Sequence, residues 1–453
     1  MTNGSLWLVE IRRGLGASFR QGVTPSLEWR RHQLLQLARM AQDHAEEWLQ
    51  AIVADLGRPI AETHLMEVGP IVERAIVSAA QLETWTTSEV FTNTVPDWQK
   101  SWKPTIYRAA KGVVLIFGPW NFPMTLTLQP LSGAIAAGCC AVVKHSEVAT
   151  RFASLLAKLL PQYLDPSAFR VVLGGPDVGA SMMKYRFFFT GGEKIGRIIA
   201  AAAGKLLTPA TLELGGKSPV IIDSNYDIKL AAKCLCVSLD HVYVAQEKQE
   251  ELIAALKECY HQFSPDGALG SGSIGHIVNE THFNRFKSLL TRTQGTIVLG
   301  GQTDDKLGME PTIVTEVTAD DSLMEEELFG PILPILPVIS IEDAISRIRS
   351  GPHPLMMSVF TDHQEIKKNG HQEFSSPRFF FAEPAVVLAN TIIKELPLGG
   401  IGASASGYYN PRYGFDTFSY LRSSIVGYTL RMICSAEQSS EFRYPPFTEK
   451  LPS

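Results

Sequence analysis

Apolar residues in the first part of the chain recur at helical spacing. Across residues 27–52 they fall on every third or fourth position, after Thr24-Pro25, a pair typical of a helix start. Gly57 then supplies a suitable helix end. Residues 62–86 predict a second long helix, and prolines mark residues 95–107 as an extended stretch.

The pattern changes at Gly112, after which short apolar runs alternate with helical segments. Apolar runs of strand length occupy residues 113–117, 140–143 and 187–189, and a helix of small residues is predicted at 130–137. Strands that are apolar throughout and separated by helices are typical of parallel βαβ units, whose sheet is covered on both faces. The sequence therefore predicts an α/β fold.

Composition and charge narrow the classes of function. The chain has 453 residues, of which 45% are hydrophobic and 19% charged, enough for two or three domains with sizeable cores. A formal net charge of −5 without a basic run argues against a nucleic-acid partner. The first residues lack the pattern of a signal peptide, and no apolar stretch approaches the roughly 20 residues that span a bilayer. Because six cysteines are too dispersed for a disulfide framework, we expect a cytoplasmic protein without a membrane partner.

A glycine-rich turn follows the third apolar strand, and it contains Thr190, Gly191, Gly192 and Gly196. Glycines let the backbone approach a ligand, and the free amides of a helix N-terminus favour an anion such as a pyrophosphate. The spacing is not the usual dinucleotide fingerprint, so a glycine turn without a ligand is an equally good interpretation.

Polar residues also follow the first two strands. Within Pro119-Trp120-Asn121-Phe122-Pro123, the Asn121 amide can donate to a developing oxyanion or bond its own backbone. Lys144 and Glu147 follow the next strand, where they can bind ribose hydroxyls or remain solvated charges. Both positions lie at carboxyl ends of strands, where ligands bind in open α/β sheets.

Two more residues can carry chemistry. Glu213 precedes two glycines and a strand, and it can act as a general base or as a structural turn residue. Cys236 precedes another apolar strand, and it can be a nucleophile or a small core residue. Cys234-x-Cys236 has no second pair or histidine cluster to match it, so no metal site is predicted.

Four motifs in order carry a resemblance to a known family. They are Phe117-Gly118-Pro119-Trp120-Asn121-Phe122-Pro123, Phe189-Thr190-Gly191-Gly192, Leu212-Glu213-Leu214-Gly215-Gly216-Lys217-Ser218-Pro219 and Glu326-Glu327-Leu328-Phe329-Gly330-Pro331. Together they resemble the motifs of NAD(P)-dependent aldehyde dehydrogenases. Phe415-Asp416-Thr417-Phe418-Ser419 with Arg443-Tyr444-Pro445-Pro446 is similar to the class 3 branch, whose substrates are fatty and aromatic aldehydes. The resemblance extends from Trp29 to Pro446.

The resemblance implies a fold and an assembly. A Rossmann-like cofactor domain would occupy residues 1–212 and be completed by 398–419, and an α/β catalytic domain would occupy 213–397. A small β oligomerisation arm would use residues 95–107 with the C-terminal segment 420–453, pairing two subunits in a homodimer.

The resemblance also assigns catalytic roles. Cys236 falls on the position of the nucleophile, Glu213 on that of the general base and Asn121 on that of the oxyanion donor. In the family's chemistry a thiolate attacks a small-molecule aldehyde, and the thiohemiacetal passes a hydride to a nicotinamide ring. Water then cleaves the resulting thioester to give the carboxylic acid.

NAD or NADP is the cofactor that the resemblance implies. The matched cofactor-binding positions are Trp120, Lys144, Glu147, Thr190, Gly191, Gly192, Gly196, Leu214, Glu327 and Phe329. Lys144 and Glu147 would hold the adenosine ribose, whereas Glu327 and Phe329 would position the nicotinamide ribose and ring. A carboxylate at Glu147 opposes a 2′-phosphate and so favours NAD, although class 3 relatives often accept both.

The chain departs from the family pattern most strongly just before Cys236. About ten residues are absent between Lys233 and Leu235, including the Gly-Gln that precedes the family's nucleophile. The other departures are a smaller gap near Tyr185, Pro377-Arg378 in place of glycines, Ala382-Glu383 in place of an Asn-Asp pair, and His145 in place of proline.

These features leave two main hypotheses. The first is an enzyme that oxidises a medium or long aliphatic or aromatic aldehyde. The second is a catalytically impaired homologue that retains cofactor binding, a pseudoenzyme or the product of a truncated gene model. A structural protein that binds no nucleotide is a third class, disfavoured by the surviving cofactor motifs.

Overall fold

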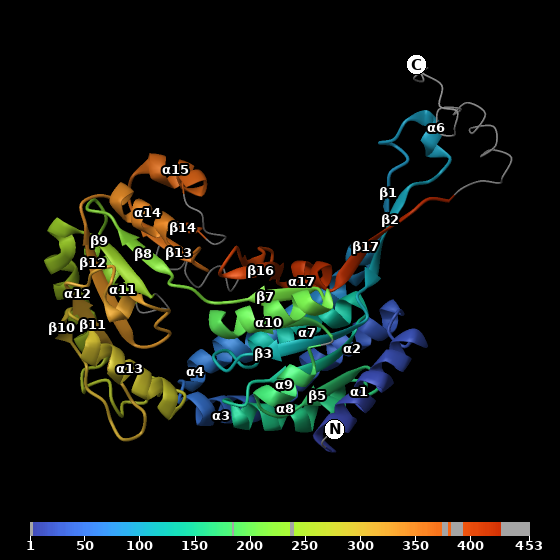
Figure 1. Ribbon diagram of the computed structural model, residues 1–453, viewed down its shortest axis with the longest axis horizontal. Coiled ribbons are helices and arrows are strands. Elements are labelled where there is room, and N and C mark those ends of the chain that lie inside the picture. Colours follow the sequence, from blue (N-terminus) through green and yellow to red (C-terminus); the bar gives the residue numbers. More distant parts are fainter. Residues whose placement is uncertain (1–2, 184, 236–239, 374–378, 382–392, 427–453) are drawn as a thin grey trace.

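The computed structural model describes residues 3–183, 185–235, 240–373, 379–381 and 393–426. Figure 1 shows two α/β bodies side by side and a narrow arm that projects away from one of them. The first body contains α1 to α5, α7 to α10 and α17; the arm contains α6; and the second body contains α11 to α15. The α/β fold expected from the sequence is therefore confirmed.

A seven-stranded sheet forms the centre of the first body. Its strands, in order across the sheet, are β15 (Leu398–Gly400), β16 (Ala405–Tyr409), β7 (Ala210–Glu213), β6 (Arg186–Thr190), β3 (Val113–Gly118), β4 (Cys140–His145) and β5 (Phe169–Val172). The five strands from β7 to β5 are parallel, whereas β15 and β16 are antiparallel to their neighbours. The strands β15 and β16, from the last part of the chain, are thus added beside β7 to a sheet whose other strands come from residues 113–213.

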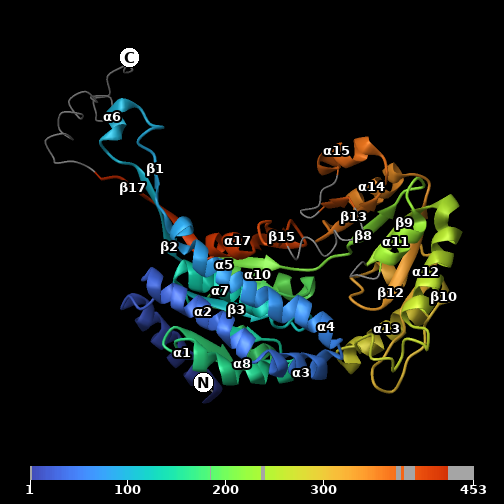
Figure 2. The ribbon, with the colours of Figure 1, turned by 180° about the vertical axis from the view of Figure 1, so that it is seen from behind.

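Helices cover both faces of this sheet. They are α1 (Asn3–Arg20), α2 (Leu27–Asp43), α3 (Ala45–Leu56), α4 (Ile60–Thr63), the π-helix η1 (His64–Val68), α5 (Gly69–Thr86), α7 (Thr125–Ala137), α8 (Thr150–Tyr163), α9 (Pro176–Ser181), α10 (Glu193–Leu206) and α17 (Pro411–Thr417). Figure 2 shows α2 and α5 lying along the body beside α7. The strands between them are apolar because they face helices on both sides: residues 114–118 and all of β4 are buried.

The second body is built around another seven-stranded sheet. Its strands, in order, are β10 (Thr296–Leu299), β11 (Thr312–Thr315), β12 (Ile332–Val338), β9 (His241–Ala245), β8 (Pro219–Ile222), β13 (Met357–Phe360) and β14 (Phe379–Phe381). Every pair is parallel except β10 with β11. Its helices are α11 (Ile228–Cys234), η2 (Gln246–Lys248), α12 (Gln249–Phe263), α13 (Glu280–Arg292), η3 (Ser322–Met324), α14 (Ile341–Ser350) and α15 (Gln364–Glu373).

The arm is a three-stranded antiparallel sheet. Its order is β1 (Glu89–Val90), β2 (Thr105–Ala110) and β17 (Ser419–Ser424), with the short helix α6 (Asp97–Lys100) near its tip. β2 and β17 pair along their whole length, from Thr105 opposite Ser424 to Ala110 opposite Ser419. Residues far apart in sequence therefore meet in this arm.

Three expected elements differ from those observed. The helix predicted across 27–52 is two helices that bend at His44, because α2 packs on α5 whereas α3 packs on α8. The helix expected at 62–86 contains the π-helical turn η1. The stretch 95–107, predicted to be extended, contains α6. The expected helix end at Gly57 is confirmed: this residue has a φ of 66° and caps α3.

No helix among the described residues is both long enough and apolar enough to cross a membrane.

Candidate active site

Parallel pairing brings several predicted site residues to one edge of the first sheet. The register places Phe117, at the end of β3, beside Lys144 on β4 and Phe189 on β6. It also places Thr190 beside Glu213, at the ends of β6 and β7. Neighbouring strands therefore end close to four predicted features: the turn 119–123, Lys144, the start of α10 and Glu213. Ligands bind at the carboxyl ends of strands in such sheets.

The N-terminus of α10 is suited to an anion. Gly192 is its N-cap residue, and no side chain among the described residues caps the first turn. Side chains here would collide with neighbours: at Gly191 with the Phe189 ring, and at Gly196 with Leu214. Both glycines therefore let helix, strand and turn approach closely, while their own N–H groups bond the carbonyls of Glu213 and Gly192. The amides of the first turn of α10 are the ones that can face an anion. These residues fit the phosphates of a dinucleotide.

Lys144 and Glu147 form an ion pair just past β4. The Lys144 Nζ donates to the Glu147 Oε2 at 2.6 Å; the lysine side chain is nearly buried, whereas the glutamate is half-exposed. Burial opposes ionisation of Glu147, but its bond with Lys144 holds the pKa of this carboxyl below the usual value. A pre-set cation and carboxylate at this edge fit the hydroxyl groups of a ribose.

His145, which stands where the family usually has proline, is fully buried. Its Nδ1 lies 3.0 Å from the Thr127 hydroxyl, and its ring packs on Phe152 with centroids 4.7 Å apart. Burial lowers the pKa of His145 to about 3, so this ring is neutral. It is a core residue beside the candidate ribose site.

Trp120 joins the two bodies. Its ring meets that of Phe329 edge-on, at 5.4 Å between centroids and 86° between planes, and it lies 5.8 Å from the His282 ring. Phe329 and His282 belong to the second body. Phe329 has a φ of 53°, a left-handed conformation uncommon for a bulky residue, and its side chain is exposed. The loop that carries it is therefore held in an unfavourable conformation by its surroundings.

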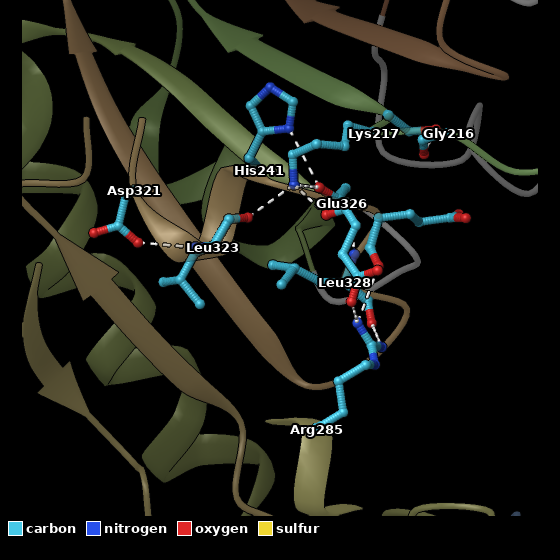
Figure 3. Close-up of polar contacts among 11 residues, drawn as sticks. Gly216, Lys217, His241, Arg285, Asp321, Leu323, Glu326 and Leu328 are labelled. Carbon is cyan, nitrogen blue, oxygen red and sulfur yellow. Dashed lines mark hydrogen bonds and ion pairs between the residues drawn. The ribbon is translucent and has the colours of Figure 1, made fainter. Parts of the chain in front are cut away.

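The loop 325–330 is fixed from two sides. The Lys217 Nζ donates to the Asp240 carboxylate at 2.5 Å and to the carbonyls of Leu323 and Glu326 at 2.9 and 3.0 Å. From the other side, the Arg285 guanidinium donates to the Glu326 carboxylate at 2.8 Å and to the Leu328 carbonyl. Figure 3 shows Lys217 and Arg285 on opposite sides of this loop.

Asp240 also holds the loop 325–330, and together with Lys217 and Arg285 it forms what we call the clamp of this loop. Its second carboxylate oxygen accepts the Leu328 N–H at 2.7 Å, and the His241 Nδ1 lies 3.5 Å from the oxygen bound by Lys217. Burial opposes ionisation of Asp240, but bonds with His241 and Lys217 lower the pKa of its carboxyl. An ionised Asp240 thus holds the backbone between Glu327 and Phe329.

Glu327 lies against the two glycines that follow Glu213. A side chain at Gly215 would collide with the Glu327 carboxylate, so only glycine permits this approach. Burial raises the pKa of the Glu327 carboxyl to about 7, and the negative charge of Asp240 contributes to this increase. The Gly216 N–H and the positive charges of Lys217 and Arg285 act on this pKa in the opposite direction. The Glu327 carboxyl can therefore change protonation near neutral pH.

Glu213 ends β7, between the two bodies. Its side chain is buried, and a Cβ added at Gly399 would lie 3.1 Å from its Oε1. Its backbone carbonyl accepts the Gly191 N–H at 3.0 Å. A carboxylate is thus placed where the first sheet ends and the chain crosses to β8.

The structure describes the segments that flank Cys236, whereas Cys236 itself lies outside the described residues. Before it, α11 is only 7 residues long and is capped by the Asp227 side chain. After it, the Asp240 N–H donates to the Ser218 carbonyl at 3.1 Å, which ties the start of β9 to that of β8. The segment that holds Cys236 is thus preceded by a helix of only 7 residues and followed by β9. Residues 377–378, 382–383 and 443–446, also singled out above, lie outside the described residues too.

The cysteines among the described residues behave as core thiols, whereas Cys434 lies outside these residues. Cys139, Cys140, Cys234 and Cys259 are buried and unpaired in disulfides. Burial raises the pKa of each thiol, to about 11 for Cys139 and about 12 for Cys140. They are poor nucleophiles at neutral pH. No group of three or more metal-ligating side chains occurs among the described residues.

Some functional side chains were missed by sequence reasoning. Lys217 lies within a quoted motif and Asp240 follows Cys236 by four residues, yet their spacing gave no sign that they meet. Arg285 and His282 lie on α13 and belong to no motif. Only an alignment of related chains would have singled them out.

The uncapped N-terminus of α10, the Lys144–Glu147 ion pair and the buried Glu213 are features compatible with a dinucleotide-dependent oxidoreductase. The chain matches the aldehyde dehydrogenase family over residues 18–424. It is 36% identical to the chloroplastic aldehyde dehydrogenase family 3 member I1 of Arabidopsis thaliana, covering 96% of this chain and 80% of the relative. It is 35% identical to aldehyde dehydrogenase family 3 member B3 of Mus musculus, covering 96% and 92%.

Solved structures agree with this relationship. The substrate-bound state of Staphylococcus aureus AldH superposes with a TM-score of 0.89 at 33% identity, over 93% of this chain and 94% of that one. An NAD+ complex of a Bacillus cereus aldehyde dehydrogenase shares the fold, with a TM-score of 0.80 at 24% identity over 92% and 88%. The chain therefore belongs to the aldehyde dehydrogenase family. It is an oxidoreductase whose reaction is the NAD(P)-dependent oxidation of an aldehyde to a carboxylic acid.

Proposed function

We propose that Cys236 carries out this reaction as the nucleophile, with Asn121 as the oxyanion donor and Glu213 as the general base. The observation that supports this most directly is the contact of Trp120 with Phe329 across the two bodies. It brings the turn that carries Asn121 to the clamped loop of the second body. The matched positions of the first body follow carboxyl ends of its strands, and this contact places Phe329 of the second body beside them.

The cofactor is bound by groups from both bodies. The amides at the start of α10 bind its phosphates, and Lys144 with Glu147 binds the adenosine ribose. Glu327 accepts hydrogen bonds from the nicotinamide ribose, and Phe329 packs on the ring. When bound, the nicotinamide accepts the hydride. A carboxylate at Glu147 repels a 2′-phosphate, so NAD is favoured over NADP.

The chain's own residues carry the remaining chemistry. The Cys236 thiolate attacks the aldehyde carbon, and the Asn121 side-chain amide donates to the oxygen on which negative charge develops. After hydride transfer a thioester on Cys236 remains. Glu213 then takes a proton from water, which attacks the thioester and releases the acid. The buried Glu213 at the junction of the two bodies supports this role.

The substrate class and assembly follow from the relatives and the arm. A medium or long aliphatic aldehyde, or an aromatic one, is the proposed substrate, because the relatives are members of family 3. A homodimer through the arm is proposed because β1 and β17 are its outer strands and carry exposed Val90 and Leu421. The free, buried thiols support a cytoplasmic location.

The test is NAD(P)H formation from a panel of aldehydes by the full chain and its Cys236→Ala variant. The matched control is Cys234→Ala, the same substitution at a buried thiol two residues away. We expect turnover by the parent chain and by the control, and a loss of at least about 10⁴-fold in Cys236→Ala.

Two other outcomes separate the alternatives. Equal turnover by the parent chain and Cys236→Ala would remove Cys236 as the nucleophile. Folded protein that binds NAD+ but shows no turnover with any aldehyde would instead favour the impaired homologue, and the shortened segment before Cys236 is the feature that would account for it.

A further inference from the structure

The turn that carries Asn121 is held by an arginine outside every motif described above. The Arg58 guanidinium donates to the backbone carbonyl of Asn121 through Nη2. Its Cζ also lies 4.4 Å from the centroid of the Phe122 ring. One cation thus contacts two successive residues of the turn 119–123, by a hydrogen bond and by a cation–π contact. The Arg58 side chain is only 12% exposed.

A buried glutamate connects this arginine to the other end of the turn. The Glu67 Oε1 accepts a bond from the Arg58 Nη1 at 3.0 Å, and its Oε2 accepts the Thr125 backbone N–H at 2.8 Å. The Glu67 side chain has no exposed surface. One carboxylate therefore supports this segment at two points: at the Asn121 carbonyl, through Arg58, and at Thr125, the first residue of α7.

The element that carries Glu67 is unusual. Glu67 lies in the π-helical turn η1, which separates α4 from α5. The Thr125 hydroxyl donates to the Met66 carbonyl at 2.7 Å, so η1 bonds the first residue of α7 through its backbone as well as through the Glu67 side chain. π-helical turns are rare and are frequent at functional sites. Here the irregular turn places a carboxylate beneath the Asn121 segment.

Arg58 is anchored in its turn by the second body. It follows Gly57, the left-handed cap of α3. The Leu56 carbonyl accepts the His276 N–H at 3.1 Å, and a side chain at Gly57 would contact the His276 ring. The position of the Asn121 turn is thereby linked to both bodies, between which the substrate must lie in the proposed function.

We propose that Arg58 and Glu67 are positioning residues, which hold the Asn121 side-chain amide at the oxyanion through the backbone of the turn 119–123. This inference rests on the proposed function, in which Asn121 stabilises the oxyanion. The geometry is that of a support, because neither side chain reaches Asn121 except through its carbonyl. A misplacement of about 1 Å in such a donor costs about 10²-fold in rate.

The principal variant is Glu67→Gln in the full chain. Glutamine replaces one of the two carboxylate oxygens by an NH₂ donor, which cannot accept from either Arg58 or the Thr125 N–H, so one of the two bonds is lost. We expect kcat for aldehyde oxidation to fall about 10²-fold, with the Kd for NAD+ unchanged. The matched control is Glu83→Gln, which removes the exposed ion pair with Arg31 and should leave kcat unchanged.

A double-mutant cycle separates positioning from general stability. If Glu67 acts through Asn121, then Glu67→Gln has no further effect on kcat once Asn121 is replaced by alanine. Independent losses that multiply in the double variant would overturn the inference. Asn121→Ala alone is expected to lower kcat about 10²- to 10³-fold.

The outcomes for the two claims are distinct. A normal kcat in Asn121→Ala would remove the oxyanion role from the proposed function. A reduced kcat in Asn121→Ala with a normal kcat in Glu67→Gln would leave the proposed function intact and overturn only the positioning role. Arg58→Lys, which retains the charge but not the guanidinium fork, is the second variant if Glu67→Gln fails to fold, with an expected loss of about tenfold in kcat.

Amide hydrogen exchange tests the support without turnover. In Glu67→Gln or Arg58→Lys, we expect the amides of residues 119–126 to exchange faster than in the parent chain or Glu83→Gln, with unchanged exchange in the strands of the second body. Unchanged exchange in residues 119–126 would overturn the inference even if the parent chain proved inactive.

Discussion

Two crossovers in this molecule connect neighbouring parallel strands, and they differ in length. In the first body, β3 and β4 are joined through α7, which has 13 residues and is buried from Thr127 to Ala137. In the second body, β8 and β9 are joined through α11, which has 7 residues. Both crossovers return the chain to an adjacent parallel strand in regular register.

The difference shows that two parallel strands pair in regular register even when the helix of their crossover has only 7 residues. A crossover must only cover a sheet face and bring the chain back, and Ile228, Ala231 and Ala232 still bury α11 against the second sheet. A catalytic site has a stricter requirement, because its reactive side chain must lie at a fixed position relative to the substrate. In the first crossover the full-length connection presents the Asn121 turn; in the second, the shortened one precedes Cys236.

After Cys236→Ala, the largest expected effect concerns Glu213, at the end of β7. Glu213→Gln should lower steady-state turnover about 10²- to 10⁴-fold, because glutamine cannot take a proton from water. Formation of the thioester does not need this base, so a burst of NADH equal to the enzyme concentration should remain. Rapid-mixing measurements of NADH absorbance test this. Loss of the burst together with turnover would contradict a role confined to the thioester step.

A pair of proline variants tests whether the first crossover is needed for NAD+ binding and the second for turnover. Proline inside a helix costs about 3 kcal/mol or more. Ala134→Pro, in α7, should destabilise the first body and abolish NAD+ binding. Ala231→Pro removes the bond from its N–H to the Asp227 carbonyl in α11, and should lower turnover about 10²-fold while NAD+ still binds. NAD+ titrations and circular dichroism check folding and binding; loss of NAD+ binding in both variants would refute the separation.

Glu327 should make cofactor affinity depend on pH. Burial raises the pKa of Glu327 to about 7, and ribose hydroxyls donate to its ionised form. Affinity for NAD+ should therefore rise as pH increases through about 7 and fall, by about tenfold, at lower pH. Glu327→Gln should bind NAD+ weakly and with little dependence on pH. Titrations between pH 5.5 and 8.5 measure this, and an unaltered pH profile in the variant would assign the titration to another group.

The smallest expected effect lies at the far end of the cofactor site. Glu147→Gln removes the carboxylate that pairs with Lys144 at 2.6 Å and leaves the cation facing the ribose. The ratio of NADP+ to NAD+ affinity should rise by a few-fold, about 1 kcal/mol for an exposed charge. Competition titrations with both cofactors measure this ratio, and an unchanged ratio would place the 2′-phosphate away from Glu147.

Much of this protein could be predicted from the sequence because its signals are local. The apolar runs that became β3, β4 and β6 need only their neighbours to be recognised as buried strands. The motif glycines are also local: the collisions that side chains would make at Gly191, Gly196 and Gly215 explain why those positions hold glycine. The family, the α/β fold and the NAD(P)-dependent reaction followed from such residues.

The tertiary structure alone decided what supports these residues. Arg58 and Glu67 are separated from Asn121 by more than 50 positions. Arg285, on α13, and Lys217, in the turn before β8, bind the loop 325–330 and its flank from opposite sides. The spacing of apolar and polar residues along the sequence does not predict such pairs, because each bond depends on how separate elements pack. The bend at His44 has the same origin, since α2 and α3 pack on different partners. Local patterns determine which segments fold and which motifs they carry; long-range packing determines which side chains meet around them.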